Sequence, residues 1–224
     1  MPREARIGCA GYPYHVTQRG NFQMNVFEDD EDKHQYMEFF MFYKNKFQVK
    51  LYAWCLMDNH VHFIVEPSTE KGLAQLFSFT HMRYSQYFNK KKGVKGHLWQ
   101  GRFFSCPLDV EHLYEAVRYV ELNPKRAGMV KRIDGYRWSS LLMHLKGKGE
   151  FEVSPISDYL DIENWKDYLN EKVNDDMVQL IKSTTKANRP AGNSIFIGEL
   201  EKITGRSFSF NKKGRPKKEK REIK

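Results

Sequence analysis

Two histidines separated by one residue are the first group in this chain whose types and spacing indicate chemistry. His60 and His62 flank Val61 in a run of apolar and β-branched residues. In a β-strand, alternate side chains point to the same face, so both imidazoles project together, close enough to bind one metal ion. Phe63 and Val65 then serve the core from the opposite face. A chain with eight histidines often contains such a pair by chance, so the spacing alone is weak support for a metal site.

A second candidate group is a tyrosine and an asparagine that precede a proline. Tyr119 and Asn123 are four positions apart, which places them on one face of a helix that is expected to stop before Pro124. A phenol with a pKa near 10 is a weak nucleophile at neutral pH, but a metal ion bound to a phosphodiester makes the phosphorus more electrophilic. The alternative is that Tyr119 simply packs in the core. Tyr114 is a competing nucleophile, because an error of helix phase would exchange the exposure of the two tyrosines.

The elements that position these residues follow from the periodicity of apolar side chains. The pattern predicts strands at 14–19, 49–57, 60–66 and 103–108 and helices at 32–47, 73–88 and 109–122. Pro107 places the last strand at an edge of the sheet. The order βαββαβ predicts an α+β fold with a ferredoxin-like (RRM-like) antiparallel sheet and helices on one face, followed by an added helix that carries Tyr119.

The C-terminal third of the chain differs in composition. Gly147-Lys148-Gly149 and Ser154-Pro155 mark a domain edge, and helical patterns follow at 156–182 and 195–203. We therefore expect a domain at 1–148 that holds both candidate groups, a helical C-terminal extension at 149–210 and a basic tail at 211–224.

The positive charge is concentrated in that tail. The chain has 37 Lys and Arg against 28 Asp and Glu, a net charge of +9, and residues 211–224 contribute eight Lys and Arg and two Glu, or +6. A segment of this composition cannot bury apolar area, and we expect it to become ordered against a polyanion. Gly214-Arg215-Pro216 is similar to an AT-hook, whose arginine enters the minor groove of A·T-rich DNA. The alternative is a tail that only increases solubility.

Composition limits the class of protein. With 40% hydrophobic and 14% aromatic residues among 224, the chain can form a core, and none of its apolar runs is long enough to cross a membrane. The three cysteines are widely spaced and never form a C-x-x-C pair, which argues against a disulfide framework or a cysteine zinc site. We expect a cytoplasmic protein.

Five motifs in register resemble those of the IS200-like, REP-associated tyrosine transposases. In chain order they are Asp58-Asn59-His60-Val61-His62-Phe63-Ile64-Val65, Tyr84-x-x-Tyr87-Phe88-Asn89, Leu98-Trp99-Gln100-Gly101-Arg102-Phe103, Arg118 to Val130 around Tyr119 and Asn123-Pro124, and Tyr136-x-Trp138-Ser139-Ser140. The resemblance covers the chain from about Tyr12 to Leu145.

The resemblance implies a metal-dependent endonuclease and strand transferase of the HUH class, with domain 1–148 as the catalytic domain. By motif, His60, His62 and Asn123 are expected to bind a divalent metal ion, Mg²⁺ or Mn²⁺, and Tyr119 is expected to form a 5′-phosphotyrosine intermediate. The expected partner is single-stranded DNA that contains a hairpin; no nucleotide cofactor and no membrane are expected, and self-association is left open. The expected DNA contacts are Trp99, Arg102, Lys125 and Arg126, together with Lys212, Lys213, Arg215, Lys217 and Lys218 of the tail. Such a protein is expected to associate with the nucleoid.

Two other classes of protein fit the same residues. A ferredoxin-like sheet with aromatic strands also describes RNA-binding modules, so the chain would then be a non-catalytic hairpin DNA- or RNA-binding protein derived from a transposase. In the other class, the same histidines serve a phosphodiesterase that uses water as its nucleophile.

Overall fold

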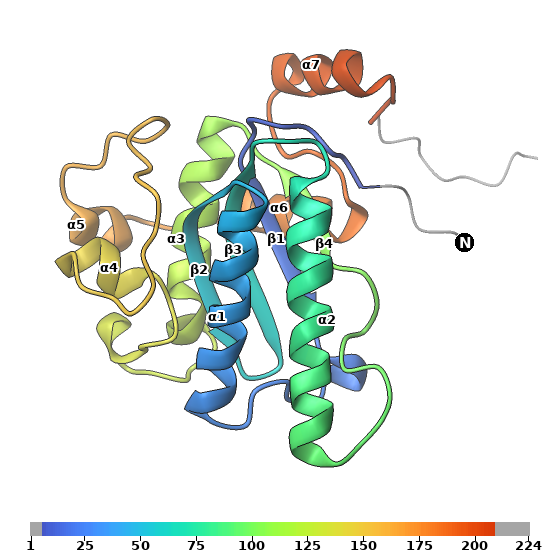
Figure 1. The fold of residues 1–224 in the computed structure, drawn as a ribbon. Coiled ribbons are helices and arrows are strands. Elements are labelled where there is room, and N and C mark those ends of the chain that lie inside the picture. The colour runs from blue at the N-terminus through green and yellow to red at the C-terminus, as the bar shows by residue number, and fades with distance from the viewer. Residues whose placement is uncertain (1–5, 209–224) are drawn as a thin grey trace, which may run out of the picture.

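The computed structural model describes residues 6–208 and is built around a four-stranded antiparallel sheet (Figure 1). The strands are β1 (Tyr14–Arg19), β2 (Val49–Met57), β3 (His60–Pro67) and β4 (Phe104–Pro107). They lie in the order β2-β3-β1-β4, so β4 is an edge strand, as the proline at its end predicts.

Seven α-helices accompany the sheet in the described part of the chain. They are α1 (Asp30–Lys46), α2 (Gly72–Lys92), α3 (Val110–Arg126), α4 (Leu141–Lys146), α5 (Trp165–Asn170), α6 (Asp175–Ala187) and α7 (Ser194–Thr204), with short 3₁₀ turns at Asn21–Gln23 and Ile133–Gly135. Asp29 and Asp109 cap α1 and α3, since each carboxylate accepts a hydrogen bond from a backbone N–H three residues on. The first six elements follow the predicted βαββαβ order, which confirms the ferredoxin-like fold.

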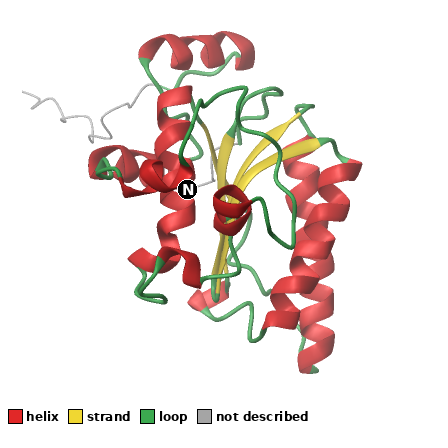
Figure 2. Cartoon of the chain, turned by 90° about the vertical axis from the view of Figure 1, so that its left-hand side faces the viewer, coloured by secondary structure: helices red, strands yellow, loops and turns green. Residues whose placement is uncertain are grey.

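Helices cover both faces of the sheet. Helices α1 and α2 pack side by side on one face, as expected, whereas α3 contacts β2 and β3 on the other face and α6 contacts β4 and β1. Figure 2, which views the sheet close to edge-on, shows helices on either side of the strands. The added helix with Tyr119 therefore covers the face of the sheet opposite α1 and α2.

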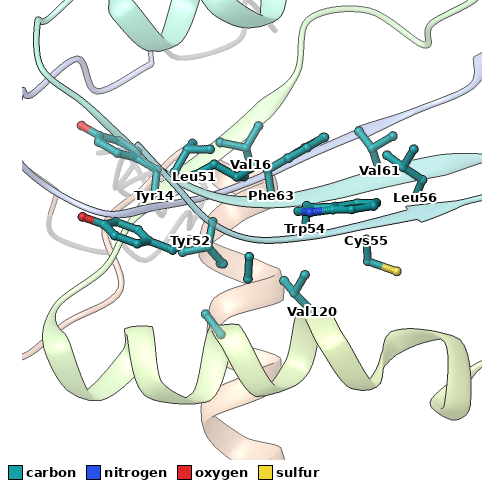
Figure 3. Packing of buried hydrophobic residues seen from close by; sticks show 14 of the residues in the cluster. Tyr14, Val16, Leu51, Tyr52, Trp54, Cys55, Leu56, Val61, Phe63 and Val120 are labelled. Carbon is teal, nitrogen blue, oxygen red and sulfur yellow. The ribbon is translucent and has the colours of Figure 1, made fainter. Parts of the chain in front are cut away.

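Strand register decides which side chains face α3. Thr17 of β1 pairs with His62 of β3, and Cys55 of β2 pairs with His62 from the other side. In Figure 3, Val16, Phe63 and Val61 point away from α3, while Cys55 points toward the helix that carries Val120. The alternation along β3 thus turns both candidate histidines toward α3 and α6.

The end of α3 differs from the expectation. The helix was expected to stop before Pro124, but it runs to Arg126 and contains the proline. Pro124 lacks only its own N–H, and the chain closes the last turn through the Ala127 N–H, which donates to the Asn123 carbonyl over 2.9 Å. The additional turn keeps Asn123 in helical conformation, one turn after Tyr119.

The C-terminal extension shares the core of the sheet. The predicted helix at 156–182 is instead two helices, α5 and α6, whose separate starts are capped by Asn164 and Asn174. The predicted helix at 195–203 is confirmed as α7. Val178 and Ile181 of α6 are fully buried in the same apolar cluster as the strands. Phe196 and Leu200 of α7 instead pack in a second, smaller cluster with Ile7 and Cys9. Within residues 6–208, no helix is long and apolar enough to cross a membrane.

Candidate active site

A pocket of about 430 Å³ opens where β1 and β3 face α3 and α6. The side chains that line it come from these four elements, from the ends of β2 and β4 and from the adjoining loops. They are His15, Thr17, Arg19, Met57, His60, His62, Gln100, Phe104, Tyr119, Asn123, Ala127, Lys182, Thr185 and Lys186. The structure therefore brings together four predicted site residues: the two histidines, the tyrosine and the asparagine.

His60 stands at the start of β3 and is oriented by its neighbour. Its Nδ1 lies 2.6 Å from Asn59 Oδ1, and the Asn59 Nδ2 donates to the Gln23 carbonyl over 3.1 Å. Because the amide nitrogen is committed to that carbonyl, the amide oxygen faces the imidazole, and the His60 Nδ1–H must donate to it. The Nε2 of His60 therefore holds a lone pair, as metal binding requires.

His62 is oriented from the other side by a residue that the sequence did not single out. Its Nδ1 lies 2.9 Å from Nε2 of His15 in β1, and His15 Nδ1 lies 2.8 Å from Thr185 Oγ1 in α6. The two imidazoles stack with ring centroids 5.1 Å apart. No motif contains His15 together with Thr185, which is 170 residues further along the chain. Only the alternation of β1, which puts His15, Thr17 and Arg19 on one face, was available as a signal.

Tyr119 projects from α3 against these histidines. Its ring lies edge-on to His62 at 5.5 Å and to His15 at 5.9 Å between centroids, and 6% of the residue is exposed. Asn123 lines the same pocket one helical turn later, and its Nδ2 is buried without a hydrogen-bond partner. Amide nitrogen and oxygen exchange places by a simple flip, so the asparagine is free to present its oxygen to a ligand.

Tyr114, the competing nucleophile, lies outside this pocket. Its hydroxyl donates to the carboxylate of Glu171, with both oxygens within 2.9 Å, and its ring packs edge-on against Tyr168 at 4.6 Å. Partial burial and the adjacent Glu171 carboxylate raise the pKa of Tyr114 to about 12. Its hydroxyl is therefore harder to deprotonate than an ordinary phenol and is turned toward the C-terminal extension.

Burial keeps the histidines of the pocket neutral. It lowers the pKa of His15 to about 3 and that of His60 to about 4, and it lowers the pKa of His62 well below its usual value, with the adjacent His60 and His15 adding to the effect. Burial raises the pKa of Tyr119, although the nearby Asn123 amide and Arg126 guanidinium oppose the rise. At neutral pH the site thus holds unprotonated imidazoles and a protonated phenol.

Cationic side chains surround the phenol. The Lys182 ammonium lies 5.2 Å and the Arg126 guanidinium 5.8 Å from the centroid of the Tyr119 ring. Arg19 and Lys186 also line the pocket, and its described lining contains no carboxylate. Such a pocket attracts anions, and phosphate groups are among the anions that Arg and Lys bind.

The residues present fit a divalent cation on the condition that a phosphate oxygen is a further ligand. Among residues 6–208, no group of three or more His, Cys, Asp or Glu gathers that could hold a metal ion by itself. The candidate ligands are instead two neutral imidazoles and one amide, which supply no negative charge. Because hard divalent ions prefer anionic oxygen ligands, this set fits such an ion when a phosphate oxygen completes it.

The predicted DNA contacts have different locations. Trp99 is only 8% exposed and packs on the His81 ring at 4.5 Å, and its contact with DNA stays a prediction. Arg102 and Lys125 line other depressions of the surface, while Arg126 lies beside the Tyr119 ring. Lys212, Lys213, Arg215, Lys217 and Lys218, with the similarity to an AT-hook, lie outside the described residues.

The fold and the pocket define a ferredoxin-like protein with a histidine pair facing a helix-borne tyrosine. The IS200-like transposase family model matches residues 10–123, half of the chain, and the chain belongs to this family. The family assignment gives it the class of an enzyme, a transposase.

Several solved structures resemble the chain, and two of them are compared with it below. A structure described as a REP-associated tyrosine transposase bound to a REP hairpin is similar with a TM-score of 0.54 and 19% identity, over 73% of this chain and 96% of that one. At this identity the likeness supports the fold alone. A protein from Deinococcus radiodurans R1, provisionally assigned as a transposase, has a TM-score of 0.38 and 15% identity over 59% of this chain and 96% of that one. No curated protein matches the chain significantly.

Proposed function

We propose that this transposase is a metal-dependent single-strand DNA endonuclease and strand transferase in which Tyr119 is the nucleophile. The observation that carries the proposal is the pocket itself. A tyrosine, two neutral imidazoles and an asparagine whose Nδ2 has no hydrogen-bond partner meet in one cationic cavity. This combination suits attack on a phosphodiester.

Lys182, Arg126 and Tyr119 have different roles in the proposed cleavage. Lys182 and Arg126 hold the DNA phosphate beside the phenol and favour the phenolate form of Tyr119. The Tyr119 oxygen forms a bond to phosphorus and the bond from phosphorus to the 3′ oxygen breaks, while the phenol proton leaves to solvent and the 3′ oxygen takes up a proton. The products are a 5′-phosphotyrosine and a 3′-hydroxyl, and the reverse reaction rejoins strands without a nucleotide cofactor.

His60, His62 and Asn123 would hold the divalent ion, Mg²⁺ or Mn²⁺. When bound, the ion polarises the phosphate and offsets the charge that develops in the transition state. The protein's own contribution is to present neutral ligands in fixed orientation, which His60 achieves through Asn59 and His62 through His15.

We further propose that the DNA contains a hairpin. The structural relative is described as bound to a REP hairpin, and the cationic lining of the pocket favours a polyanion. Arg102, Lys125 and the basic tail remain candidates for phosphate contacts outside the pocket. Association with the nucleoid would follow from this DNA binding.

A covalent adduct distinguishes this function from its two alternatives. With Mn²⁺ and labelled hairpin oligonucleotides from the flanks of its own gene, we expect wild-type protein and Tyr114→Phe to retain label through denaturing electrophoresis, and Tyr119→Phe to retain none. Cleavage by Tyr119→Phe without an adduct would indicate a hydrolase that uses water. Tight binding of the hairpin with neither cleavage nor adduct in the wild type would indicate a non-catalytic binding protein.

A further inference from the structure

A hydrogen-bonded chain behind His62 ends in the C-terminal extension. His62 Nδ1, His15 Nε2, His15 Nδ1 and Thr185 Oγ1 follow one another at 2.9 and 2.8 Å, and Thr185 Oγ1 lies 2.6 Å from the carbonyl of Ile181 in the preceding turn of α6. His15 and Thr185 are each 1% exposed. Water does not compete for these bonds, so the protein alone determines where each proton lies.

Two arrangements of the protons are compatible with these hydrogen bonds, and the carbonyl of Ile181 determines which one forms. In one, every proton points away from the pocket; in the other, Thr185 donates to His15, and His15 donates to His62. A carbonyl oxygen only accepts, so at 2.6 Å the single hydroxyl proton of Thr185 must point to Ile181. Thr185 therefore accepts from the His15 Nδ1–H, and His15 Nε2 accepts from the His62 Nδ1–H.

We propose that His15 and Thr185 are positioning residues that hold His62 as its Nδ1–H tautomer, with the Nε2 lone pair directed into the pocket. This inference rests on the proposed function for its purpose, because it prepares His62 as a metal ligand. In the opposite tautomer a proton would occupy the ligand position. The C-terminal extension, which had no assigned role from sequence, thereby contributes to the site from 123 residues beyond His62.

The orientation also has a steric component. The stacked His15 and His62 rings are inclined by only 12°, and both lie edge-on to Tyr119, at 77° and 84°. A rotation of the His62 ring about its Cβ–Cγ bond would break the hydrogen bond to His15 and disturb the packing against Tyr119. The partner of a metal-binding histidine commonly fixes both tautomer and ring angle in this way.

Thr184 offers a matched control for Thr185. It is the adjacent residue, is also buried, and its hydroxyl likewise donates to the preceding helical turn, but it contacts Cys106 Sγ rather than His15. Thr185→Val and Thr184→Val each remove one buried hydroxyl with little change of shape. Thr185→Ser keeps the hydroxyl and is expected to restore the wild-type behaviour.

The test is the tautomer of His62 in the metal-free protein, measured by ¹⁵N NMR correlation of the ring nitrogens. We expect a single Nδ1–H tautomer in wild type, Thr184→Val and Thr185→Ser, and a mixture in Thr185→Val. A wild-type Nε2–H tautomer, or an unchanged pattern in Thr185→Val, would overturn the proposal. So would an equal effect of Thr184→Val, since that would indicate loss of packing alone.

A second measurement separates the relay from the proposed function. Mn²⁺ affinity, followed through the relaxation of solvent water in the presence of the hairpin oligonucleotide, is expected to weaken about tenfold or more in Thr185→Val and to stay within about twofold in Thr184→Val. If wild-type protein shows the expected tautomer but binds no Mn²⁺, the metal function fails while the relay stands. If Mn²⁺ binds equally to Thr185→Val, the positioning role is contradicted.

Discussion

At the scale of single residues, the pocket joins neutral ligands to cationic surroundings. Burial lowers the pKa values of His60 and His62, so the proposed metal binding would not have to displace a proton at neutral pH. Burial raises the pKa of Tyr119, so its phenol is protonated at neutral pH although Lys182 and Arg126 lie beside its ring.

The lowered histidine pKa values predict how cleavage depends on pH. A histidine with an ordinary pKa of 6.5 would lose metal binding as the pH falls through that value, whereas His60, with a pKa of about 4, stays neutral to well below pH 6. We expect the cleavage rate per folded molecule at pH 5.5 to lie within about threefold of the rate at pH 7.

Initial rates between pH 5.5 and 8 test this expectation, with circular dichroism to report the folded fraction. The control is needed because stability itself falls with pH. The unfolded chain takes up protons near pH 6.5 while buried histidines do not, so acid favours unfolding. A tenfold loss of rate with a midpoint near pH 6.5 in protein that remains folded would contradict the assignment of the ligands.

At the scale of elements, α6 connects the extension to the site. One face of the helix buries Val178 and Ile181 in the core, and the next turn presents Lys182 and Thr185 to the pocket. The placement of the site residues therefore depends on a helix that follows the family-matched region by about fifty residues. Packing of α6 is expected to support both stability and chemistry.

Substitution of Ile181 tests the structural part of this role. Ile181→Ala removes a fully buried side chain and is expected to lower the free energy of unfolding by about 2–5 kcal/mol. Leu180→Ala, at the neighbouring position that is 38% exposed, is expected to cost less than about 1 kcal/mol. Urea denaturation measures both, and equal losses would show that α6 does not dock on the core as described.

An element could be predicted from the sequence when its pattern lies in neighbouring residues, and could not when it depends on contacts between distant segments. Strand β1 follows from alternation, β2 and β3 follow from apolar and β-branched runs on either side of a turn, and α1 and α2 follow from helical spacing. The end of α3 was predicted wrongly because the bias of a residue before proline was outweighed by one further closed turn at Asn123. The pairing of His15 with Thr185 left no local signal, since it arises only when α6 packs on β1.

The same reasoning separates the site residues. Strand and helix periods place His60 with His62 and Tyr119 with Asn123, but only the resemblance to the transposase motifs selected these two pairs. The structure brings both pairs into one pocket. The burial of Trp99 could not be predicted, because an aromatic residue near a basic one has the same sequence pattern whether its ring is buried or faces solvent. Lys182 was missed because a lysine in an amphipathic helix is usually solvent-exposed.

At the scale of the whole molecule, one apolar core joins the family-matched region to the extension, and one cationic pocket opens beside it. Helices on both faces of the sheet leave the pocket, rather than an open sheet surface, as the place where DNA would react. This arrangement differs from an RNA-binding sheet that stacks bases on exposed strand aromatics. We therefore expect Tyr119 to carry the covalent link to DNA.

Peptide mapping of the trapped adduct tests that claim most directly. Trypsin cleaves after Arg118, so Tyr114 falls in the peptide 103–118 and Tyr119 in the peptide 119–125. After reaction with Mn²⁺ and a hairpin oligonucleotide, nuclease trimming and mass spectrometry, we predict a 5′-phosphonucleotide on the peptide 119–125 alone. The same modification on the peptide 103–118 would identify Tyr114 as the nucleophile and would contradict the active site described above.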